Sequence, residues 1–407
     1  MDFNPSPRSE ALRRAVRAFI VERILPVESA LLAARAQGLR SPDWSTWAVD
    51  PAVEALKAEA RAAGLWNLFL PDAAQGLSTL EYAPVAEEMG HSLLAPEIFN
   101  CNAPDSGNME LLHKFGTPSQ QARWLAPLLE GQIRSAFCMT EPDVASSDAT
   151  NMAATARLDG DEVVLNGQKW WSTGLGHPRC RLLIFLGLTD PDGPRHARHS
   201  MVLVPVDAPG VEILRMLPVF GEFDEPYGHG EVRFTDVRLP REAILGGPGM
   251  GFLLAQGRLG PGRIHHCMRC IGAAERALAL MVARGLSRVA FGKPLLNLGG
   301  NRERVAEARI AIDQARLLTL HAAWRLDRDG AMGSLAEIAA IKVVAPNVLQ
   351  RVVDDAIQIF GGMGLSADTP LPSLFALARV LRLADGPDEV RKGLIARAEL
   401  ARPPRGA

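Results

Sequence analysis

The feature that most constrains the fold is a change in the spacing of apolar residues along the chain. Up to Leu129, and again after Gly251, apolar residues recur at helical spacing. Between about Ala154 and Pro240 they fall instead into short runs separated by Pro, Gly and Asp, among them RLLIFLGL, SMVLVPV, VEILRML and EVRFTDV. We therefore predict an α+β multi-domain fold that is helical at both ends, with a β-sandwich or barrel between them. The 407 residues suffice for two or three domains, and we place the boundaries at 1–131, 132–243 and 244–407.

Several local signals refine this outline. The periodicity of the opening helix predicts an end at Pro26, and Pro346 predicts a kink in a later helix. Asp159-Gly160 and Asn166-Gly167 are dipeptides that tight hairpins favour. Ser334, followed three residues later by Glu337, predicts a capping box.

Charge and composition exclude several classes of protein. Lys plus Arg total 44 and Asp plus Glu total 46, so a net charge of −2 gives no basis for a nucleic-acid partner. We find neither an apolar run long enough to cross a bilayer nor a secretory signal, which predicts no membrane association. Five cysteines, an odd number, favour free thiols in a reducing compartment, and we expect a cytoplasmic protein.

Common ligand motifs are missing. No P-loop occurs, and no G-x-G-x-x-G sequence follows a predicted strand to open a helix. The stretch His265-His266-Cys267-Met268-Arg269-Cys270 resembles a metal motif, but zinc needs about four convergent ligands, and adjacent histidines on a helix point in different directions. We therefore expect no metal site.

Two motifs admit both a structural and a binding interpretation. Gln358-Ile359-Phe360-Gly361-Gly362-Met363-Gly364 ends a predicted helix; one glycine would serve as a C-cap, whereas three also let another molecule approach the backbone closely. Trp170-Trp171 ends a predicted strand. The two rings should face opposite sides of it, and one of them could stack on a flat ligand.

The stretch RLADGPDEV, residues 382–390, interrupts two helical segments. Gly386 as a cap, Pro387 at the first helical position, and Asp388 and Glu389 in the first turn make an ordinary helix start. That interpretation leaves Asp385 without a role other than a solvated surface carboxylate.

Taken together, these motifs resemble the acyl-CoA dehydrogenase family over nearly the whole chain. The matching stretches are WLAPLLEGQIRSAFCMTEP (124–142), NGQKWWSTG (166–174), FTDVRLP (234–240), SRVAFGKPL (287–295) and QIFGGMG (358–364). TEPDVASSDATN, GPGRIHHCMR and ADGPDEV are similar to one branch, whose longer members carry an appended kinase-like domain that these residues do not include. The resemblance implies that the C-terminal domain is a four-helix bundle.

The resemblance also implies FAD as the cofactor and assigns its contacts. Thr140 and Ser146 would bond the flavin ring and the pyrophosphate, while Trp171 and Thr173 would cover the isoalloxazine near N5. A second group would reach the FAD of a neighbouring subunit and so implies a homodimer or homotetramer: Arg288, Phe291, Gln358, Gly361 and Gly362.

The family's catalytic base falls on Asp385, 27 residues after Gln358, where most members have Glu before Gly-Thr. The other position that some members use is Gly262 here, so Asp385 is the motif-supported base. Arg263 matches an arginine near the acyl-CoA and this carboxylate, although Gly260 replaces a nearby family Asp. Asp is one methylene shorter than Glu, and Pro387 replaces a Thr whose hydroxyl commonly touches the flavin.

The implied activity is α,β-dehydrogenation of an acyl-CoA, as in fatty acid β-oxidation and lipid metabolism, with an electron-transferring flavoprotein as the electron acceptor. Abstraction of the α-proton by a carboxylate and transfer of the β-hydride to flavin N5 require an acid on one face of the substrate and an electron sink on the other. Two alternatives remain open: a flavin oxidase of the nitroalkane type, which also uses Asp as the base, and a non-catalytic relative that binds flavin and DNA.

Overall fold

The computed structural model describes residues 2–38, 42–71 and 76–402. They form two compact units, each built from separate stretches of the chain. Unit 1 comprises residues 1–34, 56–99 and 260–407, and unit 2 comprises residues 35–55 and 100–259. Helices α3 (Pro51–Ala62) and α9 (Gly251–Ser287) each begin in unit 2 and continue into unit 1.

Unit 2 is built on an eight-stranded sheet. Its order is β6-β7-β3-β2-β4-β5-β8, with β1 paired to β4 in parallel. The strands are β1 (Arg134–Cys138), β2 (Thr155–Asp159), β3 (Glu162–Thr173), β4 (Cys180–Leu188), β5 (His199–Pro205), β6 (Val211–Met216), β7 (His229–Pro240) and β8 (Ile244–Leu245). Short helical segments accompany them: η2 (Trp44–Thr46), α6 (Asp105–Phe115), α7 (Pro118–Gln120), η3 (Gln121–Leu125), α8 (Ala126–Leu129) and η4 (Arg241–Ala243).

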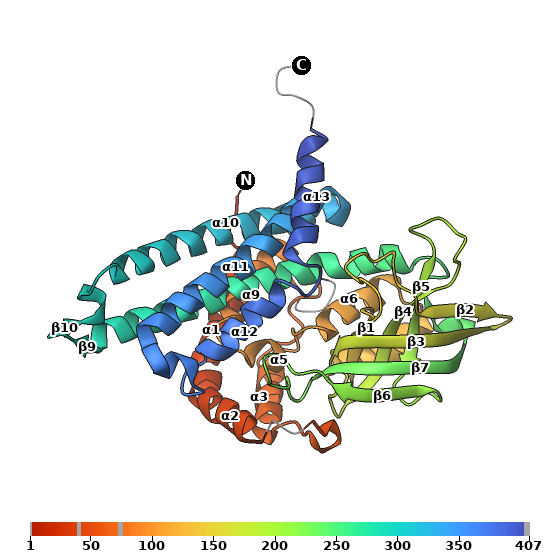
Figure 1. Ribbon diagram of the computed structural model, residues 1–407, viewed down its shortest axis with the longest axis horizontal. Coiled ribbons are helices and arrows are strands. Elements are labelled where there is room, and N and C mark those ends of the chain that lie inside the picture. The colour runs from red at the N-terminus through yellow and green to blue at the C-terminus, as the bar shows by residue number, and fades with distance from the viewer. Residues whose placement is uncertain (1, 39–41, 72–75, 403–407) are drawn as a thin grey trace. The chain divides into compact units, whose positions relative to one another are not determined.

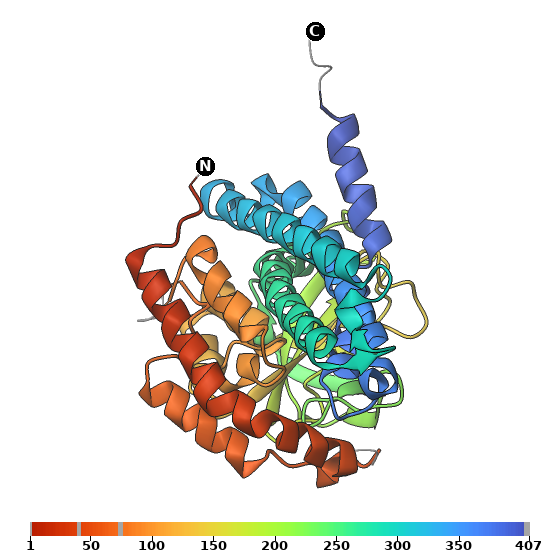
Figure 2. The ribbon, with the colours of Figure 1, turned by 90° about the vertical axis from the view of Figure 1, so that its left-hand side faces the viewer.

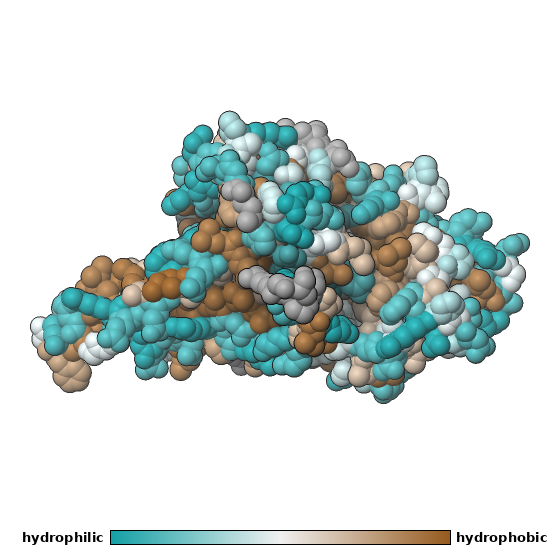
Figure 3. Space-filling model, turned by 90° about the horizontal axis from the view of Figure 1, so that it is seen from above, coloured by the Kyte–Doolittle hydropathy of each residue, from teal (hydrophilic) through white to brown (hydrophobic). Residues whose placement is uncertain are grey.

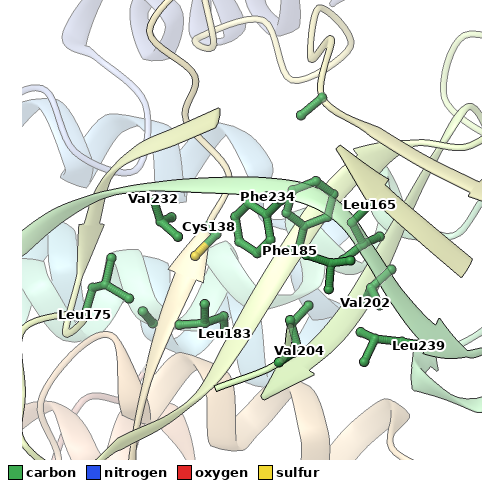
Figure 4. Close-up of a cluster of buried hydrophobic side chains, with 14 of the residues drawn as sticks. Cys138, Leu165, Leu175, Leu183, Phe185, Val202, Val204, Val232, Phe234 and Leu239 are labelled. Carbon is green, nitrogen blue, oxygen red and sulfur yellow. The ribbon is translucent and has the colours of Figure 1, made fainter. Parts of the chain in front are cut away.

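The sheet encloses an apolar core. Phe185 and Phe234 pack edge to face with their ring centroids 4.7 Å apart, and the side chains drawn in Figure 4 surround them. The core draws on most of the strands because alternate residues of each strand point inward. Trp47, from the segment before α3, completes the cluster.

Unit 1 is helical. Its N-terminal part contains α1 (Pro7–Phe19), η1 (Ile20–Ile24), the first residues of α2 (Leu25–Gly38), α4 (Thr79–Met89) and α5 (Ala95–Ile98). The C-terminal part contains the rest of α9, β9 (Val289–Ala290), β10 (Lys293–Pro294), η5 (Leu295–Asn297), α10 (Asn301–Gly333), α11 (Leu335–Phe360), η6 (Gly361–Leu365), α12 (Leu371–Leu381) and α13 (Asp388–Leu400). Helices α10 and α11 lie side by side, and α12 and α13 pack against α11 (Figures 1 and 2).

The predicted fold class is confirmed, since helical segments flank a β segment along the chain. The predicted strand runs correspond to β4, β5, β6 and β7, and the Asp159-Gly160 turn joins β2 to β3. The three-domain boundaries stay a prediction. In the described ranges no helix combines the length and the apolarity that a bilayer crossing requires.

Three local predictions were wrong. Asn166-Gly167 lies inside β3 at a register irregularity, where Asn166 exchanges hydrogen bonds with Asp236 and no turn forms. Pro26 does not end a helix; a π-helical turn, η1, precedes it, and the proline fits in the first turn of α2. The Ser334 hydroxyl donates to the Gly330 carbonyl at 2.8 Å and does not cap α11.

Candidate active site

Asp385 lies in the bend of unit 1 between α12 and α13. Its φ of +55° is left-handed, and Gly386 follows with a φ of +98°. Such values are uncommon for residues with a side chain, and Asp tolerates them better than most. Two successive left-handed residues reverse the chain sharply, which explains why an Asp-Gly pair interrupts the two helices here.

Two arginines hold the main chain of the bend. The carbonyl oxygen of Asp385 accepts hydrogen bonds from Arg263 Nε of α9 at 3.1 Å and from Arg391 Nη2 of α13 at 2.7 Å. Both arginines are buried, at 2% and 8% exposure. The structure thus places Arg263 against the main chain of Asp385, and it adds Arg391, which the sequence motifs did not indicate.

A further ring of contacts closes the turn. Arg382 Nε donates to Asp388 Oδ2 at 2.9 Å, and the Asp388 N–H donates to the Arg382 carbonyl at 3.2 Å. Lys342 of α11 donates to the Leu381 carbonyl. Asp388 and Glu389 occupy the first turn of α13 as predicted, but Pro387 is the N-cap residue instead of the first helical residue.

The carboxylate of Asp385 is not turned into bulk water. Its side chain is 21% exposed, and Oδ2 lies 3.6 Å from Nε2 of His266 on α9. Burial lowers the pKa of Lys342, and the negative charge of Asp385 opposes that shift. Burial likewise lowers the pKa of Arg391, again opposed by Asp385. These cations therefore balance the charge of the acid.

In unit 2 the loop after β1 carries Thr140 and Ser146. Ser146 Oγ accepts from the Glu141 N–H at 2.9 Å, which folds the loop back on itself. The Glu141 carboxylate accepts from the Ala153 and Ala154 N–H groups at 2.8 and 3.0 Å and from Lys169 Nζ at 2.6 Å. A buried ion pair therefore fixes the conformation that presents Thr140 and Ser146.

The end of β3 lies against this loop, because the Trp170 N–H donates to the Thr140 carbonyl at 2.9 Å. Trp171 has a φ of +53° at a second irregularity in the pairing of β3 with β7, and its side chain is 42% exposed. The prediction that the two tryptophans face opposite sides was wrong, since their ring centroids are 6.3 Å apart. The positive φ breaks the alternation of an extended strand.

Thr173 ends the same strand. Its Oγ1 lies 2.8 Å from Nδ1 of His229 on β7, and the His229 ring is 5.9 Å from that of Trp171. Unit 2 thus places Thr140 beside Trp170 on β3, with Ser146 in the same loop as Thr140 and with Trp171 and Thr173 following on the strand. In the described part of the chain, the buried Nε1 of Trp170 has no hydrogen-bond partner. This donor set fits a flat aromatic cofactor with polar edges, as FAD is.

The residues expected to contact a neighbouring subunit lie together at one end of unit 1. Arg288 immediately precedes β9, and Phe291, in the turn between β9 and β10, is 94% exposed with a φ of +50°. Gln358 lies in the last turn of α11, whose C-cap is Gly361 with a φ of +66°. The guanidinium of Arg284 lies over the Phe360 ring at 5.5 Å, which ties the end of α9 to the end of α11.

Different glycines of this cluster fit the two interpretations, the C-cap and the close approach of another molecule. Gly361 needs its left-handed φ as a C-cap, whereas a Cβ at Gly362 would meet no atom within 4 Å. Gly364 instead packs against the Ile357 backbone. The open surface at Gly362 leaves room for another molecule to approach the main chain.

The metal-like motif on α9 separates into unrelated parts. His265 is buried between the rings of Phe69 and Tyr82, with centroid distances of 6.1 and 4.9 Å. Among the described residues, no group of three His, Cys, Asp or Glu side chains is arranged to hold a metal ion. All five cysteines of the chain lie among the described residues; they are buried and form no disulfide.

Comparison with known proteins identifies the family. Models of the N-terminal, middle and C-terminal domains of acyl-CoA dehydrogenase match residues 6–132, 136–237 and 249–400. The chain is 52% identical to acyl-CoA dehydrogenase family member 10 of Mus musculus, over 97% of this chain but only 37% of the mouse protein. It is 51% identical to the probable acyl-CoA dehydrogenase FadE2 of Mycobacterium tuberculosis, over 99% of this chain and 98% of that protein.

The structural comparison agrees. A Mycobacterium abscessus protein assigned to the acyl-CoA dehydrogenases superposes with a TM-score of 0.95 at 63% identity, covering 98% of this chain and 99% of that one. The motif resemblance, the domain matches and the fold all point the same way, and the chain belongs to the acyl-CoA dehydrogenase family.

Proposed function

We propose that this enzyme catalyses FAD-dependent α,β-dehydrogenation of an acyl-CoA thioester to the trans-2-enoyl-CoA, with Asp385 as the base. The observation that carries the proposal is the bend between α12 and α13. Two buried arginines fix the main chain of Asp385, while its carboxylate stays partly accessible.

The chain's own groups have separate tasks in this reaction. Asp385 takes the α-proton of the thioester on one carboxylate oxygen, so a C–H bond breaks and an O–H bond forms. Because the bend is held at its carbonyl, the short side chain has only its own two torsions to set. A backbone N–H beside the carboxylate would stabilise the charge that develops on the thioester oxygen.

Unit 2 carries the residues that would hold the cofactor. Bound FAD would accept the β-hydrogen as a hydride. Thr140 and Ser146 would contact its polar groups, and Trp171 and Thr173 would lie against its ring system. The buried Lys169–Glu141 pair supports these roles, because it fixes the loop that carries the two hydroxyl groups.

Asp385→Asn in the FAD-loaded protein tests the assignment. Addition of an acyl-CoA should bleach the flavin absorbance of the wild type, but not that of this variant, at equal FAD content. The matched control is Glu389→Gln, which removes an exposed carboxylate four residues away and should bleach as the wild type does. Full bleaching of the Asp385→Asn protein would rule out Asp385 as the base.

The chemistry of the base leaves one other enzyme class to separate. An Asp base also suits the oxidation of nitroalkanes, in which an acidic C–H is removed next to a nitro group. Oxygen consumption with nitroethane, compared with flavin bleaching by a panel of acyl-CoAs, distinguishes the two. We expect bleaching by at least one acyl-CoA and no oxygen consumption above that of the Asp385→Asn variant.

We further infer a homodimer or homotetramer in which the β9–β10 end of one subunit contacts the FAD of another. Gln358 lies 16 residues along α11 from Lys342, which bonds the bend that carries Asp385. That is about 24 Å along the helix. The residues at this end are thus far from the base of their own subunit, which supports a role in a second site.

Surface chemistry supports the same assembly. Leu286, Val289 and Phe291 are exposed near the β9–β10 turn, and Met363 and Leu365 are exposed in η6. Figure 3 shows hydrophobic residues among hydrophilic ones along the arm of unit 1 that ends in β9 and β10.

We propose an electron-transferring flavoprotein as the acceptor, and a cytoplasmic role in fatty acid β-oxidation.

A further inference from the structure

The two histidines of α9 that follow Arg263 have different environments. His265 is 3% exposed and packs edge to face against Tyr82. The His266 side chain is 19% exposed, and its Nε2 faces Oδ2 of Asp385 at 3.6 Å. Adjacent residues on a helix point about 100° apart, so one ring can be buried in the bundle while the next faces the bend.

Arg269 fixes the tautomer of His266. Its Nη2 lies 3.2 Å from Nδ1 of the histidine, one turn earlier on α9. A guanidinium can only donate, so Nδ1 must accept, and the proton of the neutral ring is then on Nε2. The N–H of His266 consequently faces the carboxylate of Asp385.

We propose that His266 is a positioning residue for the base: its Nε2–H holds Oδ2 of Asp385 and so orients the carboxylate toward the α-proton of the substrate. This inference rests on the proposed function. A distance of 3.6 Å exceeds that of a hydrogen bond. Catalytic hydrogen bonds are often long without substrate, and we expect this one to shorten when substrate excludes water.

Three other charged groups donate to the main chain of the bend. Arg263 and Arg391 donate to the Asp385 carbonyl, and Lys342 donates to the Leu381 carbonyl. They fix where the side chain starts, and His266 adds a contact to the carboxylate itself. Such a contact matters for Asp in particular, because its short side chain has no additional torsion with which to correct a misplaced carboxylate.

A relay is the competing role. In that case His266 would accept the proton from Asp385 after each reaction. To accept at Nε2, a neutral ring needs its proton on Nδ1, where it would face the guanidinium of Arg269. The contact with Arg269 therefore favours positioning over relay. The two roles also predict different results for a glutamine at this position, which donates a hydrogen bond but cannot accept a proton: it should support the reaction if His266 positions the base, and fail if His266 is a relay.

The test uses His266→Leu and His266→Gln in the FAD-loaded protein, with stopped-flow bleaching by the best acyl-CoA. The leucine variant should lower the limiting rate about 10- to 100-fold, the range of a misplaced base, and leave the half-saturating acyl-CoA concentration within about twofold. The glutamine variant retains an N–H donor and should recover most of the rate. His321→Leu, on α10 of the same bundle, is the matched control and should behave as the wild type.

Three outcomes would overturn the inference: a wild-type rate in the leucine variant, equal loss in the leucine and glutamine variants, or a change confined to half-saturation. If the leucine variant fails to fold, Arg269→Met replaces it; this variant should slow bleaching, and a wild-type rate would again count against positioning. Failure of the wild type to bleach with any acyl-CoA is a separate result, which rejects the proposed function itself.

Discussion

Nε of Arg263 donates to the carbonyl oxygen of Asp385 across 3.1 Å and so joins α9 to the bend between α12 and α13. The contact is made to the main chain, which separates the task of holding the bend from the task of accepting a proton. Substitutions at the bend should therefore divide into those that move its backbone and those that change only its chemistry.

Arg263→Gln should weaken the bend. The loss of a charge-assisted hydrogen bond from a side chain that is 2% exposed should lower the free energy of unfolding by about 1.5–3 kcal/mol. Flavin bleaching should also slow, because the base loses its fixed starting point. Urea unfolding and stopped-flow bleaching measure the two effects. Arg309→Gln, at a side chain that is 44% exposed on α10, is the control, and an equal stability loss there would contradict the argument.

Gly386→Ala should be costly in spite of its small size. Gly386 has a φ of +98°, and an added Cβ would lie 1.9 Å from Nη2 of Arg391, which bonds Asp385. We expect a loss of about 1–3 kcal/mol in unfolding free energy together with slower bleaching. Gly393→Ala, in the middle of α13 with no atom within 4 Å of its Cβ position, should be neutral or stabilising. Thermal unfolding of both proteins gives the comparison.

Lys169→Met should destabilise unit 2 and loosen the cofactor. Lys169 is fully buried, and its removal leaves Glu141 as an uncompensated buried charge, at a cost of about 3–5 kcal/mol. Adding Glu141→Gln to the same protein should restore part of that loss, because the stranded charge is then gone. A double-mutant cycle by denaturant unfolding, with FAD retention measured alongside, tests this; strict additivity would mean that the pair is not coupled.

His265 should make stability fall in mild acid. Burial, and then the neighbouring Arg269 and His266, lower the pKa of His265 well below its ordinary value. In the unfolded chain this histidine binds a proton near pH 6.5, whereas the native ring stays neutral at that pH. The stability that the neutral ring contributes is therefore present above about pH 6.5 and is lost as pH falls below it. The free energy of unfolding should fall by up to about 1.4 kcal/mol per pH unit. His265→Phe, which keeps an aromatic ring beside Tyr82, should lose less stability between pH 7 and pH 5. Parallel pH slopes in the two proteins would refute the assignment.

Phe291→Ser should impair assembly and not folding. The side chain is 94% exposed within its own chain, so it contributes little to that chain's core. We expect a smaller species in size exclusion with light scattering, together with a lower FAD content. Leu400→Ser, at an 86% exposed side chain near the end of α13, is the matched control and should leave both unchanged.

Much of the architecture could be predicted from the sequence because it follows local rules. The strand runs and the turn at Asp159-Gly160 depend on residues next to one another, and the structure confirms them. Asn166-Gly167 carries the same local signal but forms no turn, because its partner is Asp236, 70 residues away. A bulge that depends on a distant strand cannot be distinguished from a hairpin by the dipeptide alone.

The candidate site divides in the same way. Asp385 and Arg263 stand in motifs, and the structure brings them together. The contact of His266 with Asp385 depends on the rotation of α9 about its own axis, which apolar spacing sets only roughly. No sequence pattern indicated the buried contact of Arg391 with the bend, because an arginine in the first turns of a helix is usually solvated.

The burial of all five thiols gives this protein a built-in reporter of its own opening. Burial raises the pKa of Cys138 to about 11 and that of Cys270 to about 12, so neither offers a reactive thiolate at neutral pH. An alkylating reagent should consequently leave the native chain unmodified. Alkylation of a given cysteine would then report local unfolding of the structure around it. Because Cys138 ends β1 and Cys270 lies on α9, the order of labelling would show whether the sheet or the helices yield first.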